Sequence, residues 1–148
     1  MLQLTTSSLL PPVPEITLLL FVWEDAHDKE ARYVYGPKGS ISFGGQPSPQ
    51  KLNIIFNCLS KLPDGTDRFE LHQFATSRLD KITNYTVAGS HGPSHPPHES
   101  SIAKAPSLHF SLDMMTSDSF YIDVLVKDRK YLNRIFSCDP QVENGTKT

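Results

Sequence analysis

Short apolar runs separated by turn-forming residues follow one another along most of the chain. The clearest alternation of apolar and polar residues lies in 108–112 and 120–126, as expected for half-buried strands. The other runs are bounded by Gly, Pro, Asp and Ser, which are typical turn residues. The strand candidates are 32–35, 41–43, 52–59, 69–73, 82–87, 108–112, 120–126 and 131–136. Their number and spacing predict an all-β chain of two packed antiparallel sheets.

The most apolar segment is Ile-Thr-Leu-Leu-Leu-Phe-Val-Trp at 16–23. It is too short to cross a bilayer, which takes about 20 apolar residues, and too apolar to lie alone on a surface. Pro14 and Glu15 before it, and the polar run 24–30 after it, favour a short helix over about 15–25. A buried strand is the alternative, because periodicity does not separate the two in a short run.

A helix that is apolar on nearly all sides must be covered from more than one direction. One side can pack on the sheets, and a second copy related by two-fold symmetry can cover the other. The sequence therefore predicts a homodimer and leaves open its pairing into tetramers. The predicted dimer interface consists of Ile16, Leu18, Leu19, Leu20, Phe21, Val22 and Trp23. The alternative is an ordinary core element of a monomer.

Length and charge narrow the classes of partner. The 148 residues predict a single domain over 15–138, with a flexible arm at 1–14 and a flexible tail at 139–148. A net charge of −2 provides no basic field, so we expect no nucleic acid partner and no membrane insertion. No Lys or Arg precedes Lys29, so the apolar block is interpreted as part of the mature fold rather than as a secretory signal.

No catalytic motif stands out in the sequence. Gly-x-Ser-x-Gly, His-Glu-x-x-His and a phosphate-binding Gly loop are absent, and we predict a non-enzymatic protein without a cofactor. His91, His95 and His98 have a spacing that invites zinc, but they lie among prolines and serines that give no rigid frame. We therefore predict no metal site.

The sequence allows two states for its pair of cysteines and two for its pair of N-glycosylation sequons. Cys58 and Cys138 can form one disulfide or remain two buried free thiols, because a bridge requires a close approach that the sequence does not reveal. Asn84 and Asn144 each begin an Asn-x-Thr sequon, which matters only if the chain passes through a secretory pathway.

Four segments together resemble the fungal immunomodulatory proteins, the family that includes the Ling Zhi-8 protein. They are Thr-Leu-Leu-Leu-Phe at 17–21 with Trp-Glu at 23–24, Tyr-Val-Tyr-Gly-Pro at 33–37, Leu-Asp-Lys at 79–81 with Tyr-Thr-Val at 85–87, and 117–126 followed by Tyr-Leu-Asn-Arg-Ile at 131–135. The order and spacing of the segments over 15–137 carry the resemblance. The chain departs from the family where Lys38 and Gly39 stand in place of a Trp.

The resemblance implies an immunoglobulin-like or fibronectin type III-like β-sandwich preceded by the short N-terminal helix, through which it dimerises. It also implies binding to cell-surface glycans or glycoprotein receptors, haemagglutination, effects on lymphocytes and cytokine release. Secretion or release outside the cell, without an obvious signal peptide, is implied as well. A sugar site needs an aromatic ring and hydrogen-bonding groups, and the candidates are Tyr35, Lys38, Ser40, Asp118 and Tyr121.

Two functions are therefore expected. The first is a lectin-like immunomodulatory dimer, in which two weak sugar sites gain avidity. The second is a monomeric β-sandwich adhesion or scaffold module that binds a protein partner through a sheet face or an exposed edge. The oligomeric state in solution separates the two.

Overall fold

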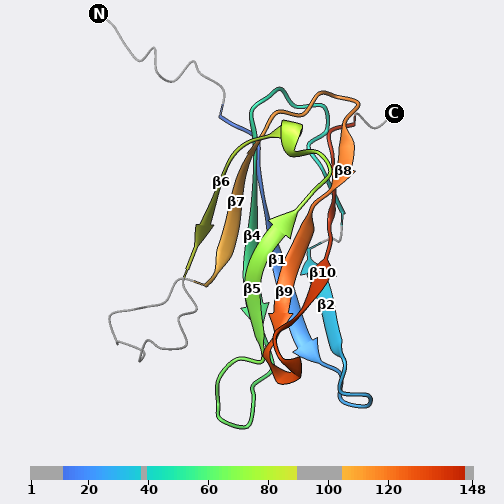
Figure 1. The fold of residues 1–148 in the computed structure, drawn as a ribbon. Helices are drawn as coiled ribbons and strands as arrows, with labels where there is room; N and C mark the ends of the chain where they lie inside the picture. Colours follow the sequence, from blue (N-terminus) through green and yellow to red (C-terminus); the bar gives the residue numbers. More distant parts are fainter. Residues whose placement is uncertain (1–11, 38–39, 90–104, 146–148) are drawn as a thin grey trace, which may run out of the picture.

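The computed structural model describes residues 12–37, 40–89 and 105–145, and these residues are almost entirely strands and turns (Figure 1). The strands are β1 Glu15–Glu24, β2 Ala31–Gly36, β3 Ser40–Ser42, β4 Gln50–Cys58, β5 Phe69–Ala75, β6 Ile82–Ala88, β7 Ser107–Leu112, β8 Ser119–Tyr121, β9 Asp123–Asp128, β10 Arg134–Cys138 and β11 Gln141–Glu143. The only helical segments among these residues are two single 3₁₀ turns, Leu79–Lys81 and Arg129–Tyr131. None of the described segments is a helix that could span a membrane. The predicted all-β class is confirmed.

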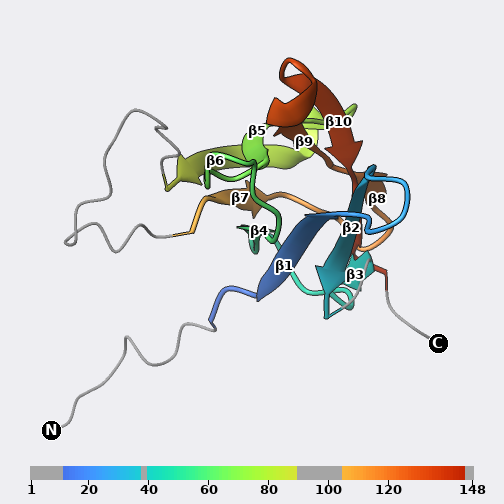
Figure 2. The same ribbon diagram turned by 90° about the horizontal axis from the view of Figure 1, so that it is seen from below.

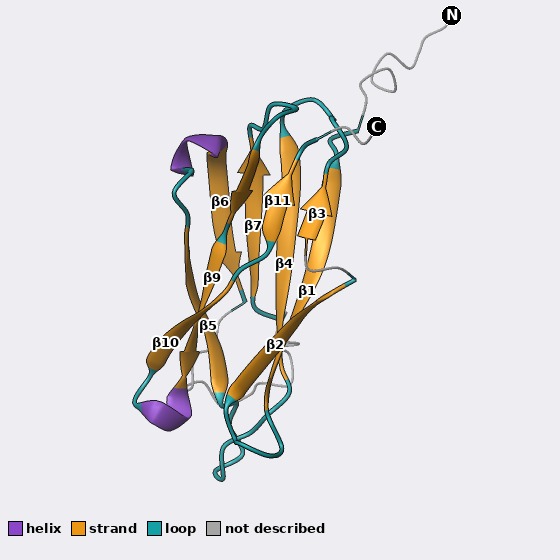
Figure 3. Ribbon diagram, turned by 90° about the vertical axis from the view of Figure 1, so that its right-hand side faces the viewer, coloured by secondary structure: helices purple, strands orange, loops and turns teal. Residues whose placement is uncertain are grey.

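The strands form three sheets (Figures 1 and 3). The largest has five strands in the order β2-β1-β4-β7-β6, and its neighbours are antiparallel except for β1 and β4, which run parallel. A second sheet has the order β10-β9-β5 and is antiparallel. A small third sheet, β3-β11-β8, is mixed.

The sheets pack in layers around one core (Figure 2). Phe74 of β5 reaches across to the five-stranded sheet, where its ring lies 4.8 Å from the ring of Phe110 on β7 and 4.8 Å from that of Tyr85 on β6, both edge to face. Such pairs stabilise a core beyond the area that they bury. The inner faces of β1, β4, β5, β7 and β9 supply most of the remaining core side chains. The outer face of the five-stranded sheet is therefore left for other contacts.

The predicted N-terminal helix is wrong, because Glu15–Glu24 forms strand β1. It lies inside the five-stranded sheet, antiparallel to β2 and parallel to β4 over eight residue pairs from Glu15 to Val22. Leu18, Leu20 and Val22 are fully buried, whereas Leu19 between them is 37 % exposed. This period of two is the side-chain pattern of a strand. Hydrogen bonds from two neighbouring strands outweigh the helix-start signal of Pro14 and Glu15.

Two further expectations change in the C-terminal part of the chain. The single strand expected over 120–126 is divided between two sheets, because β8 pairs with β11 whereas β9 pairs with β5 and β10. The tail expected to be flexible from 139 contains β11, which lies between β3 and β8. The hairpin expected between the strand candidates 120–126 and 131–136 is confirmed in β9 and β10.

Candidate functional site

The outer face of the five-stranded sheet carries two aligned rows of polar side chains. The strand register places Glu15 beside Lys51, Lys51 beside Ser111, and Ser111 beside Asn84. A second row lies two residues away on each of these strands. It consists of Thr17, Asn53, His109 and Thr86. Four strands therefore contribute to one polar area, since residues paired across a sheet project to the same face.

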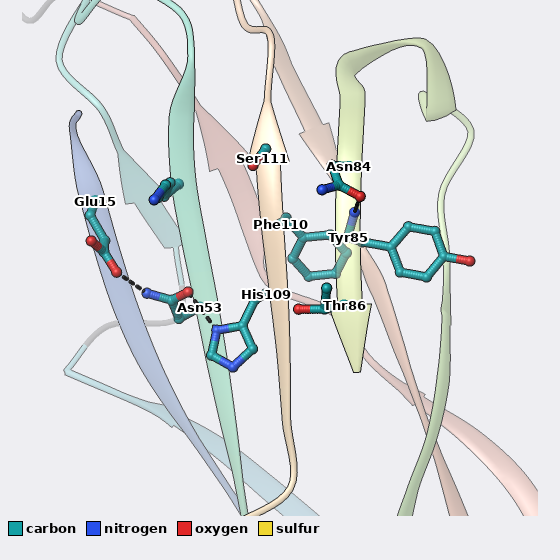
Figure 4. A pocket seen from close by; sticks show the side chains of 9 residues that line it. Glu15, Asn53, Asn84, Tyr85, Thr86, His109, Phe110 and Ser111 are labelled. Carbon is teal, nitrogen blue, oxygen red and sulfur yellow. Dashed lines mark hydrogen bonds between the residues drawn. The ribbon is translucent and has the colours of Figure 1, made fainter. Parts of the chain in front are cut away.

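Asn53 is the centre of a hydrogen-bond network in this area (Figure 4). Its Nδ2 donates to Glu15 Oε2 at 2.6 Å and to Thr17 Oγ1 at 3.1 Å. Its Oδ1 lies 2.7 Å from His109 Nδ1. An amide oxygen only accepts, so His109 Nδ1 donates to it, and His109 Nε2 lies 2.8 Å from Ser107 Oγ. These hydrogen bonds join the side chains of five residues, Asn53, Glu15, Thr17, His109 and Ser107.

An open pocket of about 280 Å³ lies over this network. Its lining consists of Glu15, Lys51, Asn53, Asn84, Tyr85, Thr86, His109, Phe110 and Ser111. Tyr85 and Phe110 also contact Phe74 on the core side, so these two rings tie the pocket to the core. We call this site the polar pocket.

The hydrogen bonds link Ser107 to His109 and His109 to Asn53, as a nucleophile, a base and an orienting group are linked in a catalytic triad. Ser107 is only 5 % exposed, however, and β7 is paired with β4 on one side and β6 on the other. The backbone N–H groups beside Ser107 therefore belong to sheet ladders and offer no donors to a developing oxyanion.

A second area of the same outer face is apolar. It consists of Leu19, Phe21 and Trp23 of β1, Val34 of β2 and Ile55 of β4, which we call the apolar strip. The register sets Leu19 beside Ile55 and Phe21 beside Val34. Leu19 and Val34 are exposed, and the other three are partly exposed.

The predicted dimer interface is split between the two faces of β1. Leu18, Leu20 and Val22 lie in the core and are excluded from any interface of the folded chain. Ile16 is partly buried and packs against the core. Leu19, Phe21 and Trp23 point to the outer face, so a partner can reach only alternate residues of the predicted set.

The predicted sugar-binding residues do not converge on one site. Tyr35 is buried, its hydroxyl donates to the Cys138 carbonyl at 2.6 Å, and burial raises its pKa. Asp118 forms an ion pair with Lys81 at 2.8 Å. Tyr121 is 55 % exposed on β8, and Ser40 pairs with Gln141 on the opposite side of β11 from Tyr121. Lys38 lies outside the described residues.

Of the two states that the sequence left open for Cys58 and Cys138, the structure has the two free thiols. Cys58 donates to the Ser60 carbonyl at 3.1 Å, and Cys138 is buried in the core. Burial raises the pKa of both thiols, to about 12 for Cys138.

The sequons differ in accessibility. Asn84 is exposed at the polar pocket, whereas Asn144 is fully buried. The Asn144 amide accepts from the Gly45 N–H at 2.9 Å and donates to the carbonyls of Gln46 and Met114 at 2.9 and 3.1 Å. A folded chain therefore has no room for a glycan on Asn144.

His91, His95 and His98, whose spacing invites zinc, lie outside the described residues. Within 12–37, 40–89 and 105–145, no group of three His, Cys, Asp or Glu side chains could hold a metal ion. His109, the fourth histidine of that region, belongs to the Asn53 network.

Comparison with known proteins finds similarity to solved structures. No protein-family model and no curated protein sequence matches the chain. The crystal structure of the inclusion body protein PixA from Burkholderia cenocepacia is similar over 93 % of this chain and 99 % of that chain, with 11 % sequence identity and a TM-score of 0.42.

The resemblance to the fungal immunomodulatory proteins is therefore wrong. No family model matches the chain, so none supports the fungal assignment. The first of the four segments, 17–24, is a strand within a sheet rather than a dimerising helix. The order of short β segments is common to many β-rich folds, so it did not identify a family.

Sequence reasoning missed the residues of the polar pocket. Glu15, Lys51, Asn53 and His109 come from three strands and form no local motif. The one available signal was the alternation within 108–112, which places His109 opposite the core-facing Leu108 and Phe110. The rest needed the sheet register.

Proposed function

We propose that the chain is a non-enzymatic, immunoglobulin-like β-sandwich module that binds another protein through the apolar strip, with a second copy of itself as the simplest partner. The layered, mainly antiparallel sheets support the sandwich assignment. The observation that carries the proposed binding is the outward projection of Leu19, Phe21 and Trp23 from a strand whose other face is in the core.

The composition of the apolar strip is that of a binding surface. Contiguous apolar side chains on an outer face mark interaction sites more often than scattered ones do. Trp and Phe are enriched at the centres of protein interfaces, and Arg32 beside Trp23 adds a third residue type that is enriched there. Polar side chains of Asn57 and Thr17 border the strip and supply the hydrogen-bonding rim of such a surface.

The strip lies next to the free edge of the sheet. Among the described strands β2 pairs only with β1, so its far side is an edge of the five-stranded sheet. A partner that covers the strip therefore meets an exposed edge as well as an apolar face. Self-association by two-fold symmetry is the commonest closed arrangement for such a surface.

Light scattering after size exclusion tests the proposal over a series of protein concentrations. We expect a concentration-dependent dimer in the native chain and a folded monomer for Leu19→Asp. Leu79→Asp is the matched control, because Leu79 is exposed and lies outside the strip. The Leu79→Asp variant should dimerise over the same range of protein concentration as the native chain. A native chain that stays monomeric at every concentration would exclude self-association and leave a different protein as the partner.

A further inference from the structure

We infer that the polar pocket is a second binding site, separate from the apolar strip, for a small carboxylate that carries hydroxyl groups, such as an acidic sugar unit. The inference rests on the hydrogen-bonding groups that the pocket presents and does not depend on the proposed self-association.

The floor of the pocket is fixed before a ligand arrives. Both Nδ2 hydrogens of Asn53 are used, by Glu15 and Thr17, and both ring nitrogens of His109 are used, by Asn53 and Ser107. Side chains that are already oriented lose little freedom on binding, so less of the interaction energy is spent on ordering them.

The rim of the pocket supplies donors that the structure does not use. Within the described part of the chain, Lys51 Nζ, Asn84 Nδ2 and Ser111 Oγ have no hydrogen-bond or ion-pair partner, and Asn84 Oδ1 accepts only from the Tyr85 N–H. Ammonium and amide N–H groups only donate, so they require acceptor oxygens. A ligand rich in carboxylate and hydroxyl oxygens meets this requirement.

The spacing of these donors sets the size of the ligand. Lys51, Ser111 and Asn84 lie in one row across β4, β7 and β6. Neighbouring strands are about 4.8 Å apart, so the row spans roughly 10 Å. A six-membered sugar ring with its substituents matches this span, and an isolated carboxylate covers only one end of it.

Charge places the carboxylate at Lys51. Lys51 is an exposed cation without an ion pair in the described structure, and a charge-assisted hydrogen bond to a carboxylate is stronger than one to a neutral hydroxyl. Glu15, its other neighbour in the row, is held by Asn53. The Glu15 charge opposes a second negative group, so the pocket favours a ligand with one carboxylate and neutral hydroxyls toward Ser111 and Asn84.

The polar pocket and the apolar strip are separate areas of one face. The pocket row begins at Glu15, four residues before Leu19, the nearest strip residue on the same strand, which is about 13 Å along β1. The pocket also extends toward β6, whereas the strip extends toward β2 at the opposite edge. A partner centred on the strip therefore leaves the pocket open to a small ligand.

Calorimetric titration of the full chain with sodium glucuronate tests the inference, with glucose and sodium acetate as comparison probes. We expect glucuronate to bind at least tenfold more tightly than either. Lys51→Gln should weaken glucuronate binding at least tenfold, and Ser111→Ala severalfold. Lys127→Gln is the matched control, because Lys127 lies on β9 in the other layer. The affinity of this variant for glucuronate should stay within twofold of that of the native chain.

Three results would overturn the inference. Equal affinities for glucuronate and acetate would mean that only the charge is recognised. Equal affinities for glucuronate and glucose would mean that the carboxylate contributes nothing. Equal losses in Lys51→Gln and Lys127→Gln would place the ligand elsewhere. Leu19→Asp should leave glucuronate affinity unchanged, so failure of the proposed self-association and failure of this site are distinguishable.

Discussion

Arg68 and Asp128 form a fully buried, two-pronged ion pair in which Arg68 Nε and Nη2 each lie 2.9 Å from a different oxygen of the Asp128 carboxylate. Arg68 Nη1 also donates to Glu24 Oε1 at 2.6 Å and to the Lys29 carbonyl at 2.9 Å. The pair therefore connects the end of β1 to β9 and to the segment before β5. Its partners lie far apart in the chain, so the pair exists only in the assembled fold.

Replacement of Arg68 should destabilise the protein strongly. Arg68→Met leaves the buried Asp128 carboxylate without its main partner, and breaking such a pair costs about 3–5 kcal/mol of the free energy of unfolding. Arg32→Met is the matched control, because Arg32 pairs with Asp25 and Asp28 at the surface, where a pair is worth about 0–1 kcal/mol. Urea unfolding measures both. Similar losses in the two variants would show that burial of Arg68 has no energetic consequence.

Stability should fall in acid. Burial alone raises the pKa of Asp128, but hydrogen bonds from Arg68 and the Lys130 N–H and the charges of Arg68 and Arg134 outweigh it and hold that pKa below 3.8. A hydrogen bond from Lys81 likewise lowers the pKa of Asp118. A lowered folded-state pKa gives stability that is fully present above the unfolded value and is lost as the pH falls through the folded value.

We therefore expect the free energy of unfolding to decrease progressively below about pH 4. Asp118→Asn should flatten this decrease, since it removes one of the lowered carboxyl groups with little loss of burial. Thermal unfolding monitored by circular dichroism between pH 2 and pH 7 measures both slopes. A slope in Asp118→Asn as steep as in the native chain would contradict the assignment of that carboxyl.

Substitutions along β1 should alternate in effect. Leu20→Ala removes a fully buried side chain and should cost about 2–5 kcal/mol. Leu19→Ala, one residue earlier, points to the outer face and should cost less than about 1 kcal/mol. Chemical denaturation gives both values. Equal costs at the two positions would be inconsistent with a strand in this register.

The two thiols should resist alkylation in the native protein. Only the thiolate attacks iodoacetamide, and burial raises the pKa of Cys138 to about 12. At pH 8 we expect no native labelling of Cys138 and slow labelling of the half-buried Cys58. In urea without reductant both should react, with the mass gain of two labels. A gain of no label in urea would reveal a disulfide that the structure lacks.

Asn144 should act as a structural residue rather than a modification site. Asn144→Ala leaves the Gly45 N–H and the Gln46 and Met114 carbonyls without this partner and should cost about 2–3 kcal/mol. Asn84→Ala, the matched control at the exposed sequon, should change stability by less than about 0.5 kcal/mol. Differential scanning calorimetry compares the two, and an unchanged melting temperature in Asn144→Ala would contradict the role.

The sequence by itself determined the all-β class and the places of most strands. The alternation in 108–112 and the turn residues between the apolar runs are local properties of the sequence. They indicate where strands and turns lie without knowledge of the partner strands. The β9–β10 hairpin was predictable for the same reason, because its strands are joined by a short polar turn.

Only the tertiary structure decided the conformation of 16–23 and the contents of the polar pocket. An apolar run of eight residues suits a helix or a strand, and pairing with β2 and β4, distant in sequence, selected the strand. The neighbours of Asn53 come from β1 and β7, and a shift of one residue in either register would turn them to the opposite face. Register depends on contacts between all the strands at once, and for this reason no local sequence pattern predicted the site.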